Sequence, residues 1–194
     1  MTTRPTKSRE DAWAVLNEFT KSDSLVKHGL AVEASMRAYA QRYGENEELW
    51  GMTGLLHDFD YEQFPQIDQH GREGARILKE RGFSEEVAYA VLAHNDATGA
   101  PRIHLLDKVL FAVDELTGLI TATALVRPSK SIHDVDAASV RKKMKDKAFA
   151  RSVSREDILK GAQELEVDME EHFGFVIQAL QGIAPDLGLE GARN

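Results

Sequence analysis

The sequence predicts an all-α fold, in a single domain of 194 residues. Along most of the chain apolar residues recur at spacings of three and four, which is the pattern of one buried helix face. Capping residues and glycines interrupt this pattern at intervals typical of helices. No segment alternates apolar and polar residues as a half-buried strand does. The length is sufficient for one sizeable core.

Local signals mark the ends of the helices expected in the first half of the chain. Gly44 and Gly82 follow two periodic segments and are expected as C-caps. Ser84 precedes another segment and is expected as its N-cap. In order, the expected helices are DAWAVLNEFT, residues 24–43, ENEELWGMTGLLHD, QHGREGARILKERG and EEVAYAVLAH.

The second half begins with the most apolar of the expected helices, over residues 104–126, which Pro128 closes. After it we expect a shorter helix over 131–151, a helix that starts at Ser154 with an S-x-x-D capping box, and an amphipathic helix from 168 to 180. The tail PDLGLEGARN is expected to fray. Together these elements predict a core over about residues 20–126 and a C-terminal helical extension over about 131–184.

Composition excludes several classes of protein. Lys and Arg total 24 and Asp and Glu total 32, so the formal net charge is −8 and general attraction to nucleic acid or anionic membranes is not expected. The absence of cysteine excludes disulfides, thiolate metal sites and cysteine nucleophiles. No apolar segment approaches a membrane span or a signal-peptide core. We expect a cytoplasmic protein.

Four residues that prefer water lie on apolar helix faces: His28, His57, His94 and Asp114. Burying such groups costs several kcal/mol unless a partner compensates, on the order of 2–7 kcal/mol for a neutral polar group. One of them alone is more often a hydrogen-bonded core residue. Several on separate faces favour a shared divalent metal, which imidazole and carboxylate ligands suit. The other histidines, His104, His133 and His172, are expected to be solvated or at helix ends.

The order of His28, the doublet His57-Asp58 and then Asp114 resembles the HD-domain superfamily, helical metal-dependent phosphohydrolases named for that doublet. The resemblance covers about residues 20–126. It implies an HD-domain-like helical bundle with additional C-terminal helices. By the same resemblance the first metal would be held by His28, His57, Asp58 and Asp114, and Asp58 would bridge to a second metal completed by His70 and His94. The cofactors would be two divalent ions among Mn, Fe, Co, Ni and Zn.

Differences between this sequence and the motifs of particular HD subfamilies limit which subfamily the chain resembles. Where many relatives read HDIG, Asp60 occupies the glycine position. The HDxxED motif of alarmone hydrolases and the HD-GYP motif of cyclic-di-GMP phosphodiesterases are both missing. The chain is therefore most similar to small HDIG-type proteins. Asp60 could orient a metal ligand or a water molecule, or it could cap the following turn.

The resemblance implies a phosphohydrolase that attacks a phosphate ester or anhydride with a metal-activated water, with Asp58 and Asp60 at the catalytic centre. The substrate would be a small phosphorylated metabolite, with a nucleotide favoured. Arg72, Lys143 and Lys147 are candidates for contacting its phosphates, although the basic stretch 141–151 is equally well explained as a solvated helix face. No general acid is identified.

Two alternatives stay open on the same residues. Some HD folds with this fuller ligand set bind two irons and activate dioxygen, so an oxygenase is one alternative. A non-catalytic HD module for binding or regulation is the other. Nucleic acid and membrane partners are not expected from the charge. A homodimer through the long apolar helix or the last amphipathic helix is compatible with the sequence.

Overall fold

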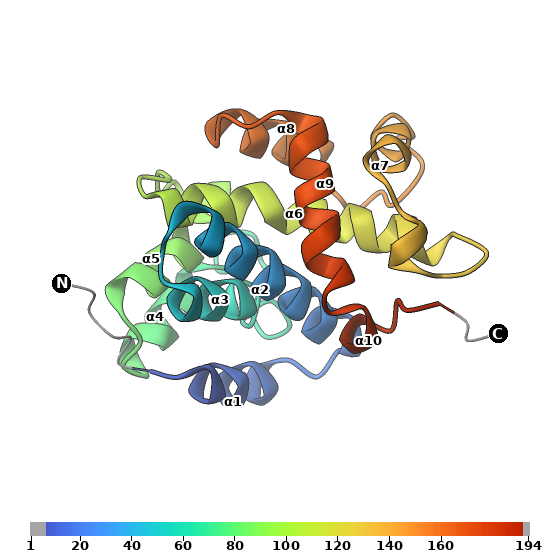
Figure 1. Cartoon of the computed structure of the whole chain (residues 1–194). Helices are drawn as coiled ribbons and strands as arrows, with labels where there is room; N and C mark the ends of the chain where they lie inside the picture. The colour runs from blue at the N-terminus through green and yellow to red at the C-terminus, as the bar shows by residue number, and fades with distance from the viewer. Residues whose placement is uncertain (1–6, 192–194) are drawn as a thin grey trace. The chain divides into compact units, whose positions relative to one another are not determined.

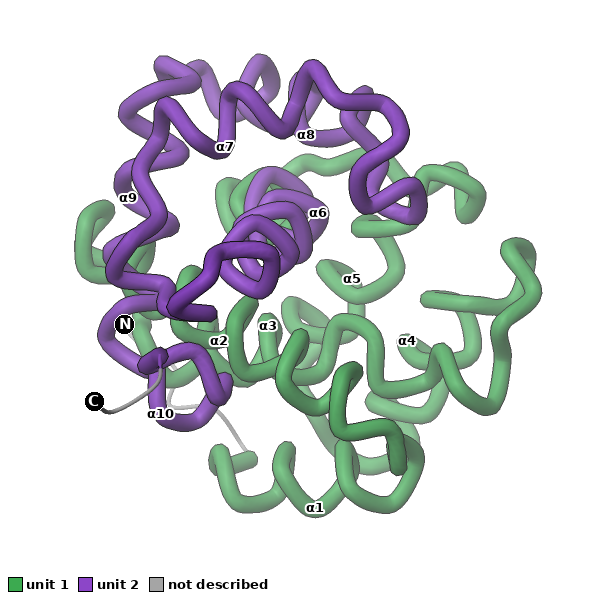
Figure 2. Tube along the Cα trace, turned by 90° about the vertical axis from the view of Figure 1, so that its right-hand side faces the viewer, with its two compact units in different colours: residues 1–110 green, residues 111–194 purple. Residues whose placement is uncertain are grey.

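The computed structural model describes residues 7–191, and this range contains helices, turns and one isolated bridge between Ser131 and Glu190 (Figure 1). The predicted all-α class is confirmed. The chain divides into two compact units, residues 1–110 and 111–194, with the boundary inside one long helix (Figure 2). In the described part of the chain, no helix is both long and apolar enough to cross a membrane.

The first unit is built from helices whose ends follow the local signals. Gly44 has a left-handed backbone, with φ of 71°, and its N–H donates to the carbonyls of the preceding turn. The Ser84 hydroxyl accepts from the Val87 amide at 3.3 Å, as an N-cap does. The elements are α1 (Arg9–Phe19), α2 (Asp23–Tyr43), α3 (Glu47–Leu56), α4 (Arg72–Glu80), α5 (Glu85–Ala93), the 3-10 helix η1 (Asp96–Thr98) and the beginning of α6 (Leu105–Leu125).

Helices α2 and α3 approach each other to backbone contact through two glycines. A Cβ on Gly54 would lie 2.9 Å from the backbone of Val32, and one on Gly29 would lie 3.1 Å from the Leu55 carbonyl oxygen. No other residue type fits at Gly54 without displacing backbone atoms. The contact brings His28, next to Gly29 on α2, close to His57 just beyond the end of α3.

Replacing Gly54 with alanine is expected to destabilise the protein by about 1–3 kcal/mol, because the new methyl group must separate α2 from α3. Gly174 provides a matched control: it lies inside helix α9 (Met169–Gln181), and no atom lies within 4 Å of where its Cβ would be. Alanine there should stabilise the protein by about 0.5–1 kcal/mol. Urea unfolding of the metal-free proteins measures both changes. Equal effects at the two glycines would contradict the close helix contact.

The second unit contains the rest of α6 and shorter elements around an apolar core. After α6 come the 3-10 helix η2 (Ile132–Asp134), α7 (Ala137–Met144), α8 (Arg155–Glu164), α9 and α10 (Ala184–Leu187). Ser154 caps α8, accepting from the Asp157 amide at 3.2 Å, but the other half of the predicted capping box is replaced, because the Ser154 amide donates to Oε2 of Glu115 at 2.9 Å. The buried side chains include Leu116, Leu119, Ile120, Val140, Ile158, Phe173, Val176 and Leu180.

The prediction of one helix over 131–151 was wrong in its extent. Helix α7 starts only at Ala137, behind a reciprocal capping box between Asp136 and Ser139, and it ends at Met144. The turns that follow are held by Arg155, whose guanidinium donates to a set of main-chain carbonyls within the preceding ten residues. The acceptors are the carbonyls of Asp146, Phe149, Ala150 and Val153. A single guanidinium therefore fixes this segment, and apolar periodicity could not reveal it.

Two further expectations for the second unit were wrong. His172 is fully buried instead of solvated, and its Nε2 lies 2.9 Å from the Ala112 carbonyl oxygen, to which it donates. Much of the tail does not fray either: α10 forms there, Leu187 and Leu189 are buried, and the Ile132 amide donates to the Leu189 carbonyl at 2.8 Å. Residues 192–194 lie outside the described range.

Candidate metal centre

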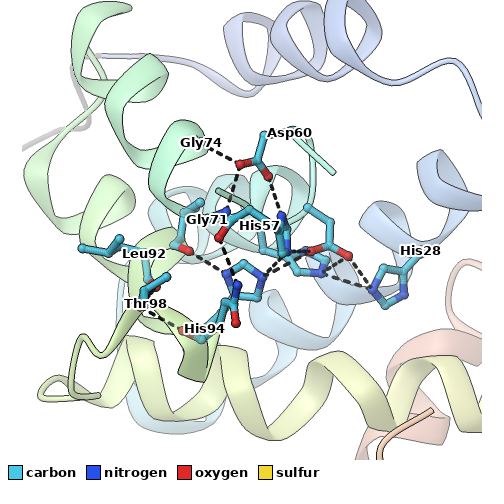
Figure 3. A network of polar contacts seen from close by, with 12 residues as sticks. His28, His57, Asp60, Gly71, Gly74, Leu92, His94 and Thr98 are labelled. Atoms are coloured by element: carbon cyan, nitrogen blue, oxygen red, sulfur yellow. Dashed lines mark hydrogen bonds and ion pairs between the residues drawn. The ribbon is translucent and has the colours of Figure 1, made fainter. Parts of the chain in front are cut away.

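Three histidines of the first unit, His28, His57 and His94, lie close together (Figure 3), and together with His70 they surround Asp58. Its two carboxylate oxygens face different pairs of imidazoles. Oδ2 lies 3.7 Å from Nε2 of His28 and 3.4 Å from Nε2 of His57. Oδ1 lies 3.1 Å from Nε2 of His70 and 3.2 Å from Nε2 of His94. One carboxylate thus separates two positions, each with two ring nitrogens and one oxygen.

The ends of helices position two of these side chains. His57 follows the last residue of α3 and His94 follows the last residue of α5, where carbonyl groups lack partners within the helix. His57 Nδ1 lies 2.7 Å from the Gly54 carbonyl oxygen, and His94 Nδ1 lies 2.6 Å from that of Val91. Each histidine is therefore anchored by its own helix with Nε2 pointing outwards.

These anchors determine which ring nitrogen carries the proton. A carbonyl oxygen only accepts hydrogen bonds, so Nδ1 of His57 and Nδ1 of His94 must be protonated. In the neutral rings Nε2 then carries a lone pair. When His70 is neutral it has the same tautomer, because its Nδ1 lies 2.8 Å from Oδ1 of the buried Asp60 carboxylate. All three rings present the nitrogen that binds metals.

Imidazole lone pairs that point at a carboxylate repel it, so this arrangement requires a positive charge among these atoms. Nε2 of His70 and Nε2 of His94 lie 3.1 Å apart, and both face Oδ1 of Asp58. The same separation of 3.1 Å joins Nε2 of His28 to Nε2 of His57. Two nitrogens that each bind a divalent cation at about 2.1 Å can be this far apart. The donor set therefore fits two cations, although protons can occupy the same positions in the metal-free protein.

The pKa values of the metal-free cluster show this competition. Burial raises the pKa of the Asp58 carboxyl, but the imidazoles of His57, His70 and His94 outweigh it and hold that pKa well below its usual range. Burial also lowers the pKa of His70, yet hydrogen bonds to the carboxylates of Asp58 and Asp60 raise it to about 9. Without metal, His70 is protonated at neutral pH. A metal must displace that proton.

The remaining predicted site residues fall into two groups. Arg72 is exposed at the start of α4 and donates through Nη2 to the Thr98 carbonyl. Asp114, Lys143 and Lys147 lie in the second unit, and their roles stay predictions from the sequence. The ammonium of Lys143 lies 4.2 Å from the centre of the Phe149 ring. A clear rise in the KM of a phosphorylated substrate after charge reversal of the two lysines would support their predicted role; unchanged kinetics would remove it.

Several residues around the cluster were missed by the sequence analysis. Gly71 and Gly74 donate their amides to the Asp60 carboxylate at 2.9 and 2.8 Å. The Asn95 side-chain amide donates to the His70 carbonyl at 3.0 Å. The ring of Tyr61, 44% exposed, meets that of His70 edge to face with centroids 5.2 Å apart. The sequence contained a signal for the two glycine donors, because Gly71 and Gly74 follow His70 closely. Gly71 adopts a φ of +81°, a backbone conformation that favours glycine.

Similarity to known proteins agrees with this geometry. Residues 25–119 match the HD domain family. This segment of the chain is therefore an HD domain. HD domains are generally metal-dependent hydrolases, and the superfamily is one of metal-dependent phosphohydrolases. The matched segment contains all the histidines and aspartates predicted to bind metal.

One curated relative also matches part of the chain. It is an uncharacterized protein from Methanocaldococcus jannaschii, 34% identical over 90 residues, which make up 44% of this chain. The match spans about half of that relative, 52% of its length. No solved structure matches the chain.

Proposed function

We propose that this HD protein is a two-metal phosphohydrolase that cleaves a phosphate ester or anhydride of a small phosphorylated metabolite, with a nucleotide as the favoured substrate. The observation that supports it is the placement of Asp58. Each of its carboxylate oxygens faces a separate pair of imidazole Nε2 atoms, at 3.1 to 3.7 Å. A single carboxylate shared in this way suits two adjacent cations.

Two groups of side chains in the cluster would each hold one of those cations. His28, His57 and one oxygen of Asp58 would hold the first, with Asp114 as the further ligand predicted from the sequence. His70, His94 and the other oxygen would hold the second. When bound, divalent cations polarise a phosphoryl group and lower the pKa of a water molecule towards neutrality. The fixed Nδ1–H tautomers keep the imidazole lone pairs aimed at the cations, so little reorganisation is needed.

The preference for a nucleotide rests on two side chains beside the cluster. Tyr61 exposes 44% of its surface while its ring contacts the His70 ring, so a flat aromatic surface lies next to the second position. Bases stack on such surfaces with about 1–3 kcal/mol of stabilisation per base. Arg72 is exposed, and its bond to the Thr98 carbonyl uses one of the five N–H donors of a guanidinium. The others are suited to a phosphate.

A substrate screen tests the proposed reaction. The protein, stripped of metal and then loaded separately with Mn, Fe, Co, Ni or Zn, is incubated without dioxygen with nucleoside mono-, di- and triphosphates and with sugar phosphates. We expect metal-dependent release of phosphate or of a nucleotide product. Turnover that requires both iron and dioxygen would indicate the oxygenase alternative instead. A metal-loaded protein that hydrolyses none of these compounds would contradict the proposal.

Replacing Tyr61 with alanine is expected to raise the KM for the nucleotide about 5- to 30-fold, because the stacking surface is lost. Tyr61→Phe keeps the ring and should change the KM by about twofold or less. Steady-state kinetics with the nucleotide and with a phosphate ester that lacks an aromatic group provide the comparison. An equal effect of Tyr61→Ala on both substrates would exclude base stacking at this ring.

A further inference from the structure

Asp60 carries a fully buried carboxylate that makes three short hydrogen bonds (Figure 3). Oδ2 accepts from the Gly71 amide at 2.9 Å and from the Gly74 amide at 2.8 Å. Oδ1 accepts from Nδ1 of His70 at 2.8 Å. The two oxygens therefore have different partners: one holds the start of α4, and the other holds a histidine of the candidate metal centre.

Gly71 and Gly74 fix the orientation of the Asp60 carboxylate. A Cβ on Gly74 would lie 2.9 Å from Oδ2 of Asp60, so the amide can reach the carboxylate only because no side chain intervenes. Gly71 has a φ of +81°, which an L side chain rarely adopts, and a Cβ there would lie 3.1 Å from the Val91 carbonyl oxygen. Two backbone donors thus fix Oδ2 as an acceptor and direct Oδ1 at His70.

His70 differs in this respect from the other two anchored histidines. His57 and His94 donate to main-chain carbonyls, which are neutral, whereas His70 donates to an ionisable carboxylate. A carboxylate behind an imidazole fixes its tautomer and makes the opposite nitrogen a stronger ligand. Through His70, the second position, formed by Asp58, His70 and His94, receives this support.

We propose that Asp60 is a positioning residue for the second cation. It fixes the tautomer of His70 in which Nε2 carries the lone pair, and it leaves the first position, at His28 and His57, unaffected. This inference rests on the metal centre of the proposed function. It assigns to Asp60 an effect on one of two cations, which a general role in stability would not produce.

The substitution Asp60→Asn tests the inference with almost no change of shape. The two glycine amides still require an oxygen, so the new NH₂ group must point at Nδ1 of His70. That nitrogen then has to accept, and the proton moves to Nε2, where it blocks a metal. We expect the affinity for the second cation to fall about 10- to 100-fold or more, while the first is retained.

Two measurements report this change without using activity. Elemental analysis after dialysis against limiting Mn should fall from about two cations per chain to about one. Nitrogen-15 NMR of the neutral histidines in the metal-free variant should show His70 protonated at Nε2 in place of Nδ1. Retention of both cations with wild-type affinity would overturn the inference. Equal loss of both cations would also overturn it, since Asp60 would then support the whole centre.

Asp107 provides a matched control. It is a buried aspartate that accepts from the Ile103 and His104 amides at 3.1 and 2.9 Å, and neither of those bonds involves the metal centre. Asp107→Asn should keep both cations.

If Asp60→Asn fails to fold, a second variant tests the inference. Gly74→Ala leaves Asp60 chemically intact but crowds its Oδ2 atom, and the same selective loss of the second cation is expected. A wild-type protein that binds no metal would refute the proposed function itself. That result differs from a failure of the inference about Asp60, in which the wild type binds two cations and the variant does not lose the second one selectively.

Discussion

Replacing Asp58 with alanine is expected to release both cations and to lower kcat/KM about 10³-fold or more, since both depend on its carboxylate. Each oxygen of Asp58 faces two imidazole nitrogens. Removing it takes a ligand from both positions at once. The measurement is metal content per chain, by elemental analysis, for wild type and variant purified identically.

A control from the same segment is Asp68→Ala. Asp68 is exposed in the loop before His70, so its removal should change neither metal content nor turnover. About one cation in the wild type, lost in Asp58→Ala, would indicate a mononuclear hydrolase in which His70 and His94 serve other roles. An Asp58→Ala protein that keeps two cations and its activity would refute the bridging role. No metal in either protein, even after reconstitution, would favour the non-catalytic module.

The helices could be predicted because the signals that end them are local. Gly44, Ser84 and Ser154 each act on the turn next to them, and the structure has all three as caps. Periodicity also placed His57 and His94 at the ends of their helices. Why these side chains point at Asp58 could not be predicted, because it depends on carbonyls at the helix ends and on the glycine contact between α2 and α3.

The role of Asp60 shows where sequence reasoning reaches its limit. Orienting a ligand and capping the next turn were treated as alternatives. In the structure one oxygen of Asp60 accepts from His70, and the other accepts from Gly71 and Gly74 at the start of α4, eleven and fourteen residues later, and not from the turn that directly follows Asp60. Two other features could not be predicted for similar reasons. The burial of His172 depends on Ala112, a partner distant in sequence, and the contacts of Arg155 form in turns that have no apolar periodicity.

In the metal-free protein, stability is expected to fall as the pH rises from neutral through about 9. The folded-state pKa of His70 is about 9 and its ordinary value is 6.5, so protonated His70 stabilises the fold fully below 6.5 and stops doing so above about 9. The shift corresponds to about 3 kcal/mol at most, because one pKa unit is about 1.4 kcal/mol. Urea unfolding with a chelator present measures it. Constant stability across this range would contradict the raised pKa.

Affinity for the second cation should change with pH in the opposite direction. His70 must lose its proton before Nε2 can bind a metal, so below its pKa of about 9 the affinity rises about tenfold per pH unit. Between about pH 6 and pH 8 the expected gain is about 100-fold, with about one proton released per cation bound. Competition titrations with a metal-sensitive dye measure the affinity, and calorimetry in buffers of different ionisation enthalpy counts the proton. An affinity independent of pH would mean that the cation does not replace the proton on His70. The carboxylates of Asp58 and Asp60 would then stabilise only the protonated ring, and the second position would belong to a histidine ion pair instead of a metal.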